Sequence, residues 1–537
     1  MSRQSEQRPP PPGRWEEPAP SSTASSSQGG PTRALAAALL AVFIGALDLT
    51  VIATILPRMV SDLQINTADI DRYVWVVNGY LLAYMVAIPI IGRVSDVVGR
   101  LAAFEASLAV FLVGSVWCAL ANTLGGLIIG RAIQGAGGGA LLPVTMALVG
   151  DVVARERRVS ALGLVGAVDT LGWVLGPLWG AAVVSLASGV EPWHWVFLVN
   201  VPLGGLAAVA VVRSVPAARG VGRQWLSGLD LVGAGLLASA LVLLNLALSA
   251  GGELGVTGSG GRALGGSHNP LNSYLVPLIL GAGLLGGLFV WWERRVAHPL
   301  LPLGLFRRRR FAAAIVANAI AGAALIVAMV DVPVVVALLV VPERVSSLSA
   351  LMLAPFTLLM AALSLGGGVI SGRLGERTTA VIGLVLVAVG YAVLWYGLRG
   401  EQYVGLLPGL ALAGAGFGLV IAPIGATVLD AAPALDRGIA AGLTLVFRLL
   451  GMTIGISTLT AIGVRRLQTL TGSLDDVIQG PGESTAEFLA RQTQFLNERV
   501  IPLSIQVVRE TFLIAGVLAL LALVPVSFIG RTRAGDR

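Results

Sequence analysis

Long apolar runs dominate this chain of 537 residues and restrict what it can fold into. A run of about 20 apolar residues can cross the ~30 Å hydrocarbon core of a membrane as one α-helix. About fourteen such runs follow one another; they lie near residues 34–56, 73–92, 102–121, 124–149, 159–187, 195–212, 229–250, 273–292, 311–340, 346–371, 380–398, 404–429, 438–464 and 508–529. The sequence therefore predicts an all-α polytopic membrane protein with 14 transmembrane helices.

The composition and the placement of charge agree with this class. Hydrophobic residues make up 55% of the chain and charged residues 12%, whereas soluble domains are about 25% charged. The net charge is +7 and all 36 basic residues are arginine. Most of them, including Arg307 to Arg310, fall on the side that holds both chain ends, which is the positive-inside pattern and not a nucleic-acid-binding patch. We expect a multi-pass protein of the cytoplasmic (inner) membrane with both termini in the cytoplasm.

Residues that hold metals, phosphates or nucleophiles in other proteins are scarce. Cys118 is the only cysteine, and the three histidines are scattered without ligand spacing. Because the chain has no lysine, it cannot form a phosphate-binding Gly-Lys-Ser/Thr loop. The sequence predicts no metal site, no cofactor and no enzymatic activity, and it leaves the proton gradient as the energy source.

An internal repeat predicts the architecture. Three glycine patterns recur at a nearly constant spacing: GRVSD at 92–96 as GRLGE at 372–376, GAGGG at 135–139 as GAGFG at 414–418, and GLVGAVDTLGWVLG at 163–176 as GLTLVFRLLGMTIG at 442–455. The spacing includes an even number of helices, so the two halves are parallel repeats of six helices. Transporters use such repeats to rock around a site at the membrane midplane.

The repeat and the apolar runs together give the predicted domain boundaries. These are a disordered cytoplasmic tail at 1–33, an N-terminal six-helix half at 34–213, an inserted helix pair with its loops at 214–310, a C-terminal half at 311–530 that includes a periplasmic loop at 465–507, and a cytoplasmic tail at 531–537. Apolar residues recur at helical spacing within the periplasmic loop and predict an amphipathic helix lying on the outer surface. It either caps the bundle or shields a lipid that leaves the membrane.

Four motifs resemble those of a known family. They are the loop motif GRVSDVVGR with Gly92, Asp96, Gly99 and Arg100, the motif GRAIQGAGG with Arg131, the antiporter motif LGWVLGPLWGA with Gly172, Gly176, Pro177 and Gly180, and LDLTVIATILP with Asp48. The chain thereby resembles the major facilitator superfamily, and within it the fourteen-helix drug:proton antiporters. It departs from the loop motif at Val97 and Leu101, which are usually basic, and from the antiporter motif at Ala181. The resemblance implies the major facilitator fold, with the loop motif acting in conformational change.

A narrower resemblance is to the mycobacterial triacylglyceride and drug exporters, which work with a periplasmic lipoprotein. It rests on GALD, GALLPVT, the VDV around Asp331, and GLVIAP followed by an arginine-bearing helix. This resemblance implies a hydrophobic small molecule or a lipid as substrate, with a periplasmic lipoprotein as partner.

Five charges are predicted to lie within apolar helices: Asp48, Arg131, Asp169, Asp331 and Arg448. A charge at the centre of a membrane helix costs about 2.5–3.5 kcal/mol on insertion scales, so its presence indicates a function. Asp169 and Arg448 occupy matching positions of the repeat. We expect them to approach each other in one transport state; the alternative is a static ion pair or separate partners.

Asp48 and Asp331 are also expected to be counterparts, each in the first helix of its half. The resemblance places these two helices on a central cavity, where either carboxylate could carry a proton. The alternative is that hydrogen bonds hold them only to shape the helices. Arg131 has a role in proton coupling within the resembling family; the alternative is packing. The sequence as a whole predicts a proton-coupled antiporter that exports hydrophobic drugs or lipids by alternating access. A triacylglyceride exporter rather than a multidrug pump is the alternative, and a non-transporting receptor or scaffold is a remote one.

Overall fold

The structure is a computed structural model that describes residues 30–63, 70–153, 155–187, 192–214, 230–251, 274–296, 299–340, 342–398, 403–433, 437–472 and 484–529. Within these ranges every regular element is helical. The tail segments 1–29 and 531–537 and most of the loop before Ser484 lie outside the described residues. The predictions made for them stay predictions.

The helices follow the predicted apolar runs. The first part of the chain forms α1 (Gly30–Asp62), α2 (Ile70–Val98), α3 (Arg100–Ala119), α4 (Leu124–Val152), α5 (Arg155–Leu186), α6 (His194–Leu198), α7 (Asn200–Ser214), α8 (Leu231–Gly251) and α10 (Leu275–Glu293). The second part forms α11 (Arg309–Leu339), α12 (Pro342–Leu374), α13 (Glu376–Gly397), α14 (Leu407–Ala431), α15 (Arg437–Thr471), α16 (Thr485–Phe495), α17 (Ile501–Leu521) and α18 (Leu523–Val526).

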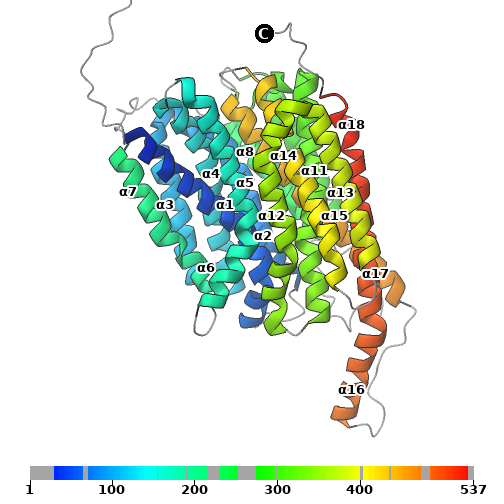
Figure 1. Ribbon diagram of the computed structural model, residues 1–537. Helices are drawn as coiled ribbons and strands as arrows, with labels where there is room; N and C mark the ends of the chain where they lie inside the picture. The colour runs from blue at the N-terminus through cyan, green and yellow to red at the C-terminus, as the bar shows by residue number, and fades with distance from the viewer. Residues whose placement is uncertain are drawn as a thin grey trace, which may run out of the picture.

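The two parts of the bundle use the same helix pairings (Figure 1). In the first, α1 packs on α5 and α7, and α4 packs on α2 and α3. In the second, α11 packs on α15 and α17, and α14 packs on α12 and α13. The parts meet where α5 contacts α12 and where α2 contacts α15. This pairing is the structural counterpart of the sequence repeat.

Repeated glycines explain why equivalent helices approach equally closely. A Cβ atom at Gly135 of α4 would collide with the carbonyl oxygen of Tyr80 on α2. A Cβ atom at Gly414 of α14, the counterpart of Gly135 in the repeat, would collide with the carbonyl oxygen of Phe356 on α12. Small residues let membrane helices pack backbone against backbone, so the GAGGG pattern is a packing device in both halves.

The helices confirm a polytopic all-α membrane protein. Among the described residues, eleven helices are long and apolar enough to cross a membrane, or twelve if the bent helix α5 counts as one span. Two shorter apolar helices, Trp75–Ile91 and Val232–Ala247, fall below that length. They coincide with two of the predicted runs, and the count of 14 stays a prediction.

Helices α8 and α10 pack on each other and form a separate hairpin. α8 also contacts α2 and α15, which places this pair beside the junction of the two parts. Only 11% of the span Leu275–Glu293 is buried, so α10 presents most of its apolar surface outward, towards lipid. The boundaries of the inserted pair stay a prediction.

The predicted amphipathic helix does not lie across the end of the bundle. Ser484 and Glu487 form a capping box that begins α16, and the chain then continues through the π-turn Leu496–Val500 into α17. Figure 1 shows α16 projecting beyond the bundle as an extension of its last long helix. The prediction of a surface-lying helix was wrong because no glycine or proline between Thr485 and Ile501 separates it from α17.

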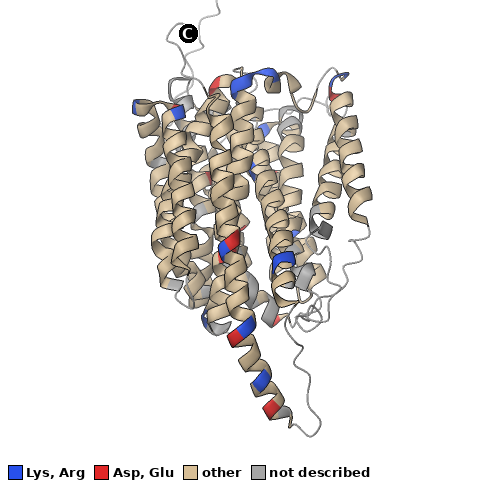
Figure 2. Ribbon diagram, turned by 90° about the vertical axis from the view of Figure 1, so that its right-hand side faces the viewer, with Lys and Arg blue, Asp and Glu red and all other residues tan. Residues whose placement is uncertain are grey.

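Charged residues occupy mainly the ends of the bundle and the projecting helix (Figure 2). Along most of its height the bundle surface is uncharged, as a lipid-facing surface must be.

Candidate functional site

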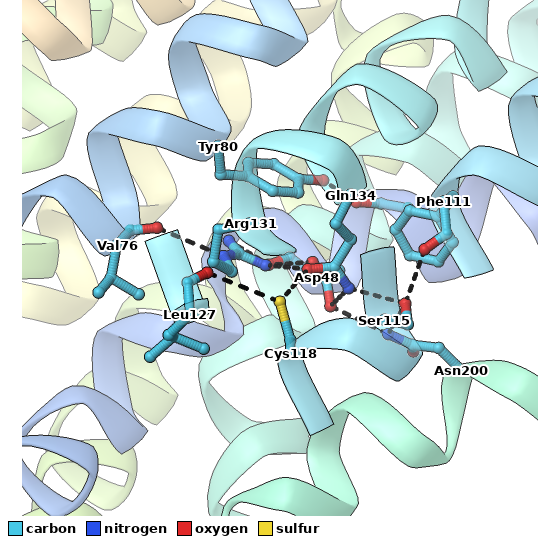
Figure 3. Close-up of polar contacts among 11 residues, drawn as sticks. Asp48, Val76, Tyr80, Phe111, Ser115, Cys118, Leu127, Arg131, Gln134 and Asn200 are labelled. Atoms are coloured by element: carbon cyan, nitrogen blue, oxygen red, sulfur yellow. Dashed lines mark hydrogen bonds and ion pairs between the residues drawn. The ribbon is translucent and has the colours of Figure 1, made fainter. Parts of the chain in front are cut away.

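A buried polar network surrounds Asp48 in the first half (Figure 3). Its Oδ2 atom accepts a hydrogen bond and an ion pair from Nη1 of Arg131. Its Oδ1 atom accepts from the amides of Gln134 at 2.9 Å and Asn200 at 3.0 Å. Asp48 is 2% exposed and Arg131 is fully buried. The carboxylate therefore has a counter-ion and three side-chain donors, and almost no contact with solvent.

The Arg131 guanidinium is held from several sides. Its Nη1 atom also donates to Oε1 of Gln134 at 2.7 Å, and its Nε atom donates to the carbonyl oxygen of Val76 at 3.4 Å. The ring of Tyr80 lies against it, with 4.0 Å between the guanidinium carbon and the ring centroid. Ser115 of α3 accepts from Gln134 at 2.8 Å. The network therefore ties α1, α2, α3, α4 and α7 together.

Two tyrosines connect this network to the junction of the halves. Tyr80 and Tyr84 lie one helical turn apart on α2, with their ring centroids 5.7 Å apart. Tyr80 interacts electrostatically with both Asp48 and Arg131, and Tyr84 interacts with Asp169 and Arg448. Two tyrosines at i and i+4 in an aliphatic helix are visible in the sequence as a signal, but this pair was not among the predicted site residues.

Asp169 and Arg448 interact electrostatically, but no ion pair between them is found among the described residues. Asp169 lies on α5 and Arg448 on α15, and each is the largest electrostatic partner of the other. Among the described residues, no hydrogen bond reaches the buried Nε atom of Arg448. An arginine nitrogen without a partner inside a membrane bundle is costly. This geometry fits a pair that closes in another conformation.

Asp331 lies in the second half and has a different setting. It accepts a hydrogen bond from the hydroxyl of Thr511 on α17. No charged side chain of the described residues faces it, and the one ionisable neighbour is Tyr391, whose hydroxyl donates to the carbonyl oxygen of Ala324. Asp331 is therefore an acid within the bundle that lacks a counter-ion.

The packing of the repeat shows which residues of the first helices are equivalent. Gly172 of α5 packs against the backbone of Phe43, and Gly451 of α15 packs against the backbone of Ala319. Phe43 of α1 and Ala319 of α11 are therefore equivalent, and the rest of the two helices can be aligned from this pair.

The expectation that Asp48 and Asp331 are counterparts was wrong, because this register places them at different heights on equivalent helices. The residue equivalent to Asp48 is Ala324, and the residue equivalent to Asp331 is Ile55. The two acids lie on equivalent helices but about two turns apart, which is about 10 Å along the axis. Among the described residues of the second half there is no counterpart of the Asp48 network, and Tyr391 lies at the corresponding place on α13.

The antiporter motif shapes α5 against α1. A Cβ atom at Gly172 would come within 2.6 Å of the Phe43 carbonyl oxygen, and one at Gly176 would collide with Thr50. Pro177 cannot donate to the carbonyl of Trp173, four residues earlier. Thr50 donates to that carbonyl instead, at 2.6 Å.

The chain bends by 51° just before this proline, between the segments Leu164–Trp173 and Leu175–Leu186. The fourth motif residue, Gly180, is buried. The motif therefore fixes both a bend and a close contact.

The structure describes only part of the loop motif. Gly99 has a φ of 100°, and α3 begins directly after it at Arg100. Gly375 repeats this geometry in the second half with a φ of 86° before α13. Residues with side chains rarely adopt such angles. Gly92 and Asp96 lie in the last turns of α2, and the contacts of the Asp96 side chain lie outside what the structure describes.

Among the described residues, no group of three or more His, Cys, Asp or Glu side chains could hold a metal ion. The arrangement instead combines one closed ion-pair network with acids that have few or no partners.

Known proteins provide the context for this geometry. The sequence model of the Major Facilitator Superfamily matches residues 38–456. A triacylglyceride transporter of Mycolicibacterium smegmatis is 36% identical over 483 residues, which are 87% of this chain and 82% of that protein. A triacylglyceride transporter of Mycobacterium tuberculosis is 35% identical over 472 residues, which are 84% of this chain and 86% of that protein.

Solved transporters share the fold at low sequence identity. A bacterial homologue of the human lysosomal transporter Spinster superposes with a TM-score of 0.62 at 14% identity, over 95% of this chain and all of that one. The xylose transporter XylE from E. coli superposes with a TM-score of 0.55 at 11% identity, again over 95% of this chain and all of that one. The chain is a multi-pass membrane transporter and not an enzyme, and it belongs to the Major Facilitator Superfamily.

Proposed function

We propose that this protein is a proton-coupled exporter of neutral lipids of the triacylglyceride class, which it moves across the cytoplasmic membrane by alternating access. The observation that carries the proposal is the contrast between the closed Asp48–Arg131 network and the uncompensated charges at Asp169, Arg448 and Asp331. Charges that neutralise each other stabilise the packing of the helices around them, whereas acids without a permanent counter-ion are able to gain and lose protons.

The substrate class is inferred from the relatives. Those of M. smegmatis and M. tuberculosis are named triacylglyceride transporters and align with more than four fifths of this chain. A neutral lipid needs an apolar path and no charged recognition group, which fits the low charge of the bundle. Hydrophobic drugs are the other substrate class that such a path would accept.

Asp331 is the proposed proton carrier. Protonation of an acid that has only a hydroxyl partner leaves no other charge stranded. Protonation of Asp48 would strand the fully buried Arg131, at a cost of about 3–5 kcal/mol. The proposed role of Asp48 is therefore structural: it stabilises the packing of α1 against the neighbouring helices.

Asp169 and Arg448 are the proposed link between proton and lipid movement. They lie on α5 and α15, and each of these helices contacts the opposite half. Closure of the pair would draw α5 towards α15, and protonation of Asp169 would release them. Tyr84 lies beside both charges and is expected to position them.

The proposed orientation has both chain ends in the cytoplasm, with the Arg307 to Arg310 cluster on the same side. The projecting helix α16 would then lie in the periplasm, where a lipoprotein that receives the lipid could reach it.

The test uses purified protein in proteoliposomes loaded with a fluorescent triacylglyceride. Lipid movement should require an imposed proton gradient, and Asp331→Asn should abolish gradient-driven movement. Glu498→Gln is the matched control, because it removes one exposed acid from the π-turn that joins α16 to α17. Wild-type movement that ignores the gradient would exclude proton coupling, and wild-type behaviour of Asp331→Asn would exclude that residue as the carrier. Transport of a cationic dye without any lipid movement would favour the drug pump.

A further inference from the structure

A cavity of about 390 Å³ lies where the last long helix leaves the bundle. It is formed between the end of α13 and the first turns of α17. It is separate from Asp48, Asp169 and Asp331, and the proposed lipid path does not use it.

One wall of this cavity is apolar. Leu398 comes from the end of α13, and Ile501, Pro502 and Ile505 come from α17. The volume is within the range of small-molecule sites, and the wall provides a surface for several methylene groups of an acyl chain.

The opposite wall carries an uncompensated positive charge. Glu510 forms an ion pair with Arg466 through two hydrogen bonds, with Nε–Oε2 and Nη2–Oε1 distances of 2.8 and 3.1 Å. The Nε atom of Arg509 donates to the carbonyl oxygen of Trp395 at 2.9 Å, and its guanidinium lies 5.4 Å from the ring centroid of Trp395. Among the described residues, no carboxylate pairs with Arg509. Its two terminal nitrogens remain for an anion.

The depth of Arg509 matches the headgroup layer. About 20 residues separate it from Ile529 at the opposite end of α17 and α18, which is about 30 Å of helix and equals the hydrocarbon thickness. α18 packs against α11, the helix that begins next to the Arg307 to Arg310 cluster. Arg509 therefore lies at the membrane surface away from that cluster. Trp395 beside it fits the aromatic belt found at this depth.

We infer that this cavity binds an anionic glycerophospholipid from the leaflet opposite the arginine cluster, with its phosphate on Arg509 and one acyl chain along the apolar wall. A guanidinium that offers two parallel N–H donors suits a phosphate. A triacylglyceride has no anionic group and would not use Arg509, so the site is distinct from that of the proposed cargo. Its occupant would hold α17 against α13 at the point where the projecting helix begins.

The test measures lipid retention on the purified full-length protein by native mass spectrometry. Phosphatidylglycerol should bind saturably and at least about tenfold more tightly than phosphatidylcholine, because the choline cation of phosphatidylcholine neutralises its phosphate and repels the Arg509 guanidinium. Arg509→Gln should weaken phosphatidylglycerol binding by about tenfold. Arg509→Lys should weaken it less, since lysine keeps the charge but not the planar donor pair.

Arg499→Gln is the matched control, because it removes the same charge from an exposed position beyond the cavity. It should leave the binding of phosphatidylglycerol unchanged. Equal binding of both lipids would show an apolar groove without anion recognition. Glycerol phosphate that binds as tightly as phosphatidylglycerol would show a free-phosphate site. Equal losses in Arg509→Gln and Arg499→Gln would show a general charge effect, and each of these three results would overturn the inference.

Discussion

Replacing Asp48 with asparagine should lower the folding stability of the protein, whether or not Asp48 takes part in proton transport. Both carboxylate oxygens accept hydrogen bonds, Oδ2 from Arg131 and Oδ1 from Gln134 and Asn200. Asparagine supplies one oxygen and one NH₂ group. On one side of the site, this NH₂ group would therefore face the N–H donor of a neighbouring side chain and could not accept its hydrogen bond. The substitution also removes the counter-ion of a fully buried guanidinium.

The size of the effect follows from this geometry. Two unit charges about 4 Å apart attract by about 4 kcal/mol at an effective dielectric constant of 20. Removing one partner of a buried pair costs about 3–5 kcal/mol, because the other is left uncompensated. We therefore expect Asp48→Asn to lower the free energy of unfolding by about 3–5 kcal/mol, a large part of the total stability of a typical domain.

The assay is a denaturant titration in detergent micelles, carried out as a double-mutant cycle with Arg131→Gln. The double variant removes both charges, so it should be less destabilised than the sum of the single variants by several kcal/mol. For Asp48→Asn, a loss of stability no larger than that of an ordinary surface substitution, about 0.5 kcal/mol, would refute the reasoning. So would additive effects of the two substitutions. If the stability does fall, lost transport in this variant says nothing about whether Asp48 carries a proton.

Three further predictions concern the repeat and the motifs. Asp169→Ala and Arg448→Ala should each abolish gradient-driven lipid movement, and the exchange Asp169→Arg with Arg448→Asp should restore part of it; no restoration together with active single variants would exclude their interaction. Gly172→Ala should lower the free energy of unfolding by about 1–3 kcal/mol through overpacking, whereas Gly166→Ala on the same helix meets open space and should change it little; equal values in denaturant titrations would contradict the packing argument. Asp96→Asn should slow lipid movement without weakening lipid binding, and a parallel loss of affinity would place that residue in the binding site.

Patterns that depend on local rules could be predicted from the sequence. Apolar length alone located the helices, and the glycine repeat predicted two equivalent halves, in which the structure shows matched pairings and close contacts such as that of Gly135 with α2. The antiporter motif was matched by its residues without a prediction of its geometry, and the cause of that geometry is visible at Pro177 and Thr50. These features follow from the chain because each depends on residue size or on a missing backbone donor.

Side-chain partners across helices could not be predicted in the same way. The sequence placed Asp48 and Arg131 in a coupling role but did not pair them, because they are far apart in the chain and helix rotation decides which faces meet. For the same reason, the sequence did not predict that Tyr84 interacts with both Asp169 and Arg448. The continuity of α16 with α17 was missed because a charged helix outside the membrane gives no apolar signal.

The two halves share a backbone but differ in how they hold their charges, and this difference bears on mechanism. In the first half, Asp48 and Arg131 neutralise each other within one network that joins five helices. In the second half, Tyr391 lies in the corresponding place, and within the described part of the chain Thr511 is the one hydrogen-bond partner of the Asp331 side chain. A neutralised network resists rearrangement, because any movement would expose an unpaired ion. An acid without a counter-ion changes its interactions each time it gains or loses a proton. The first half is therefore expected to move as a rigid body, with proton-dependent changes arising in the second half and at the junction where Asp169 faces Arg448.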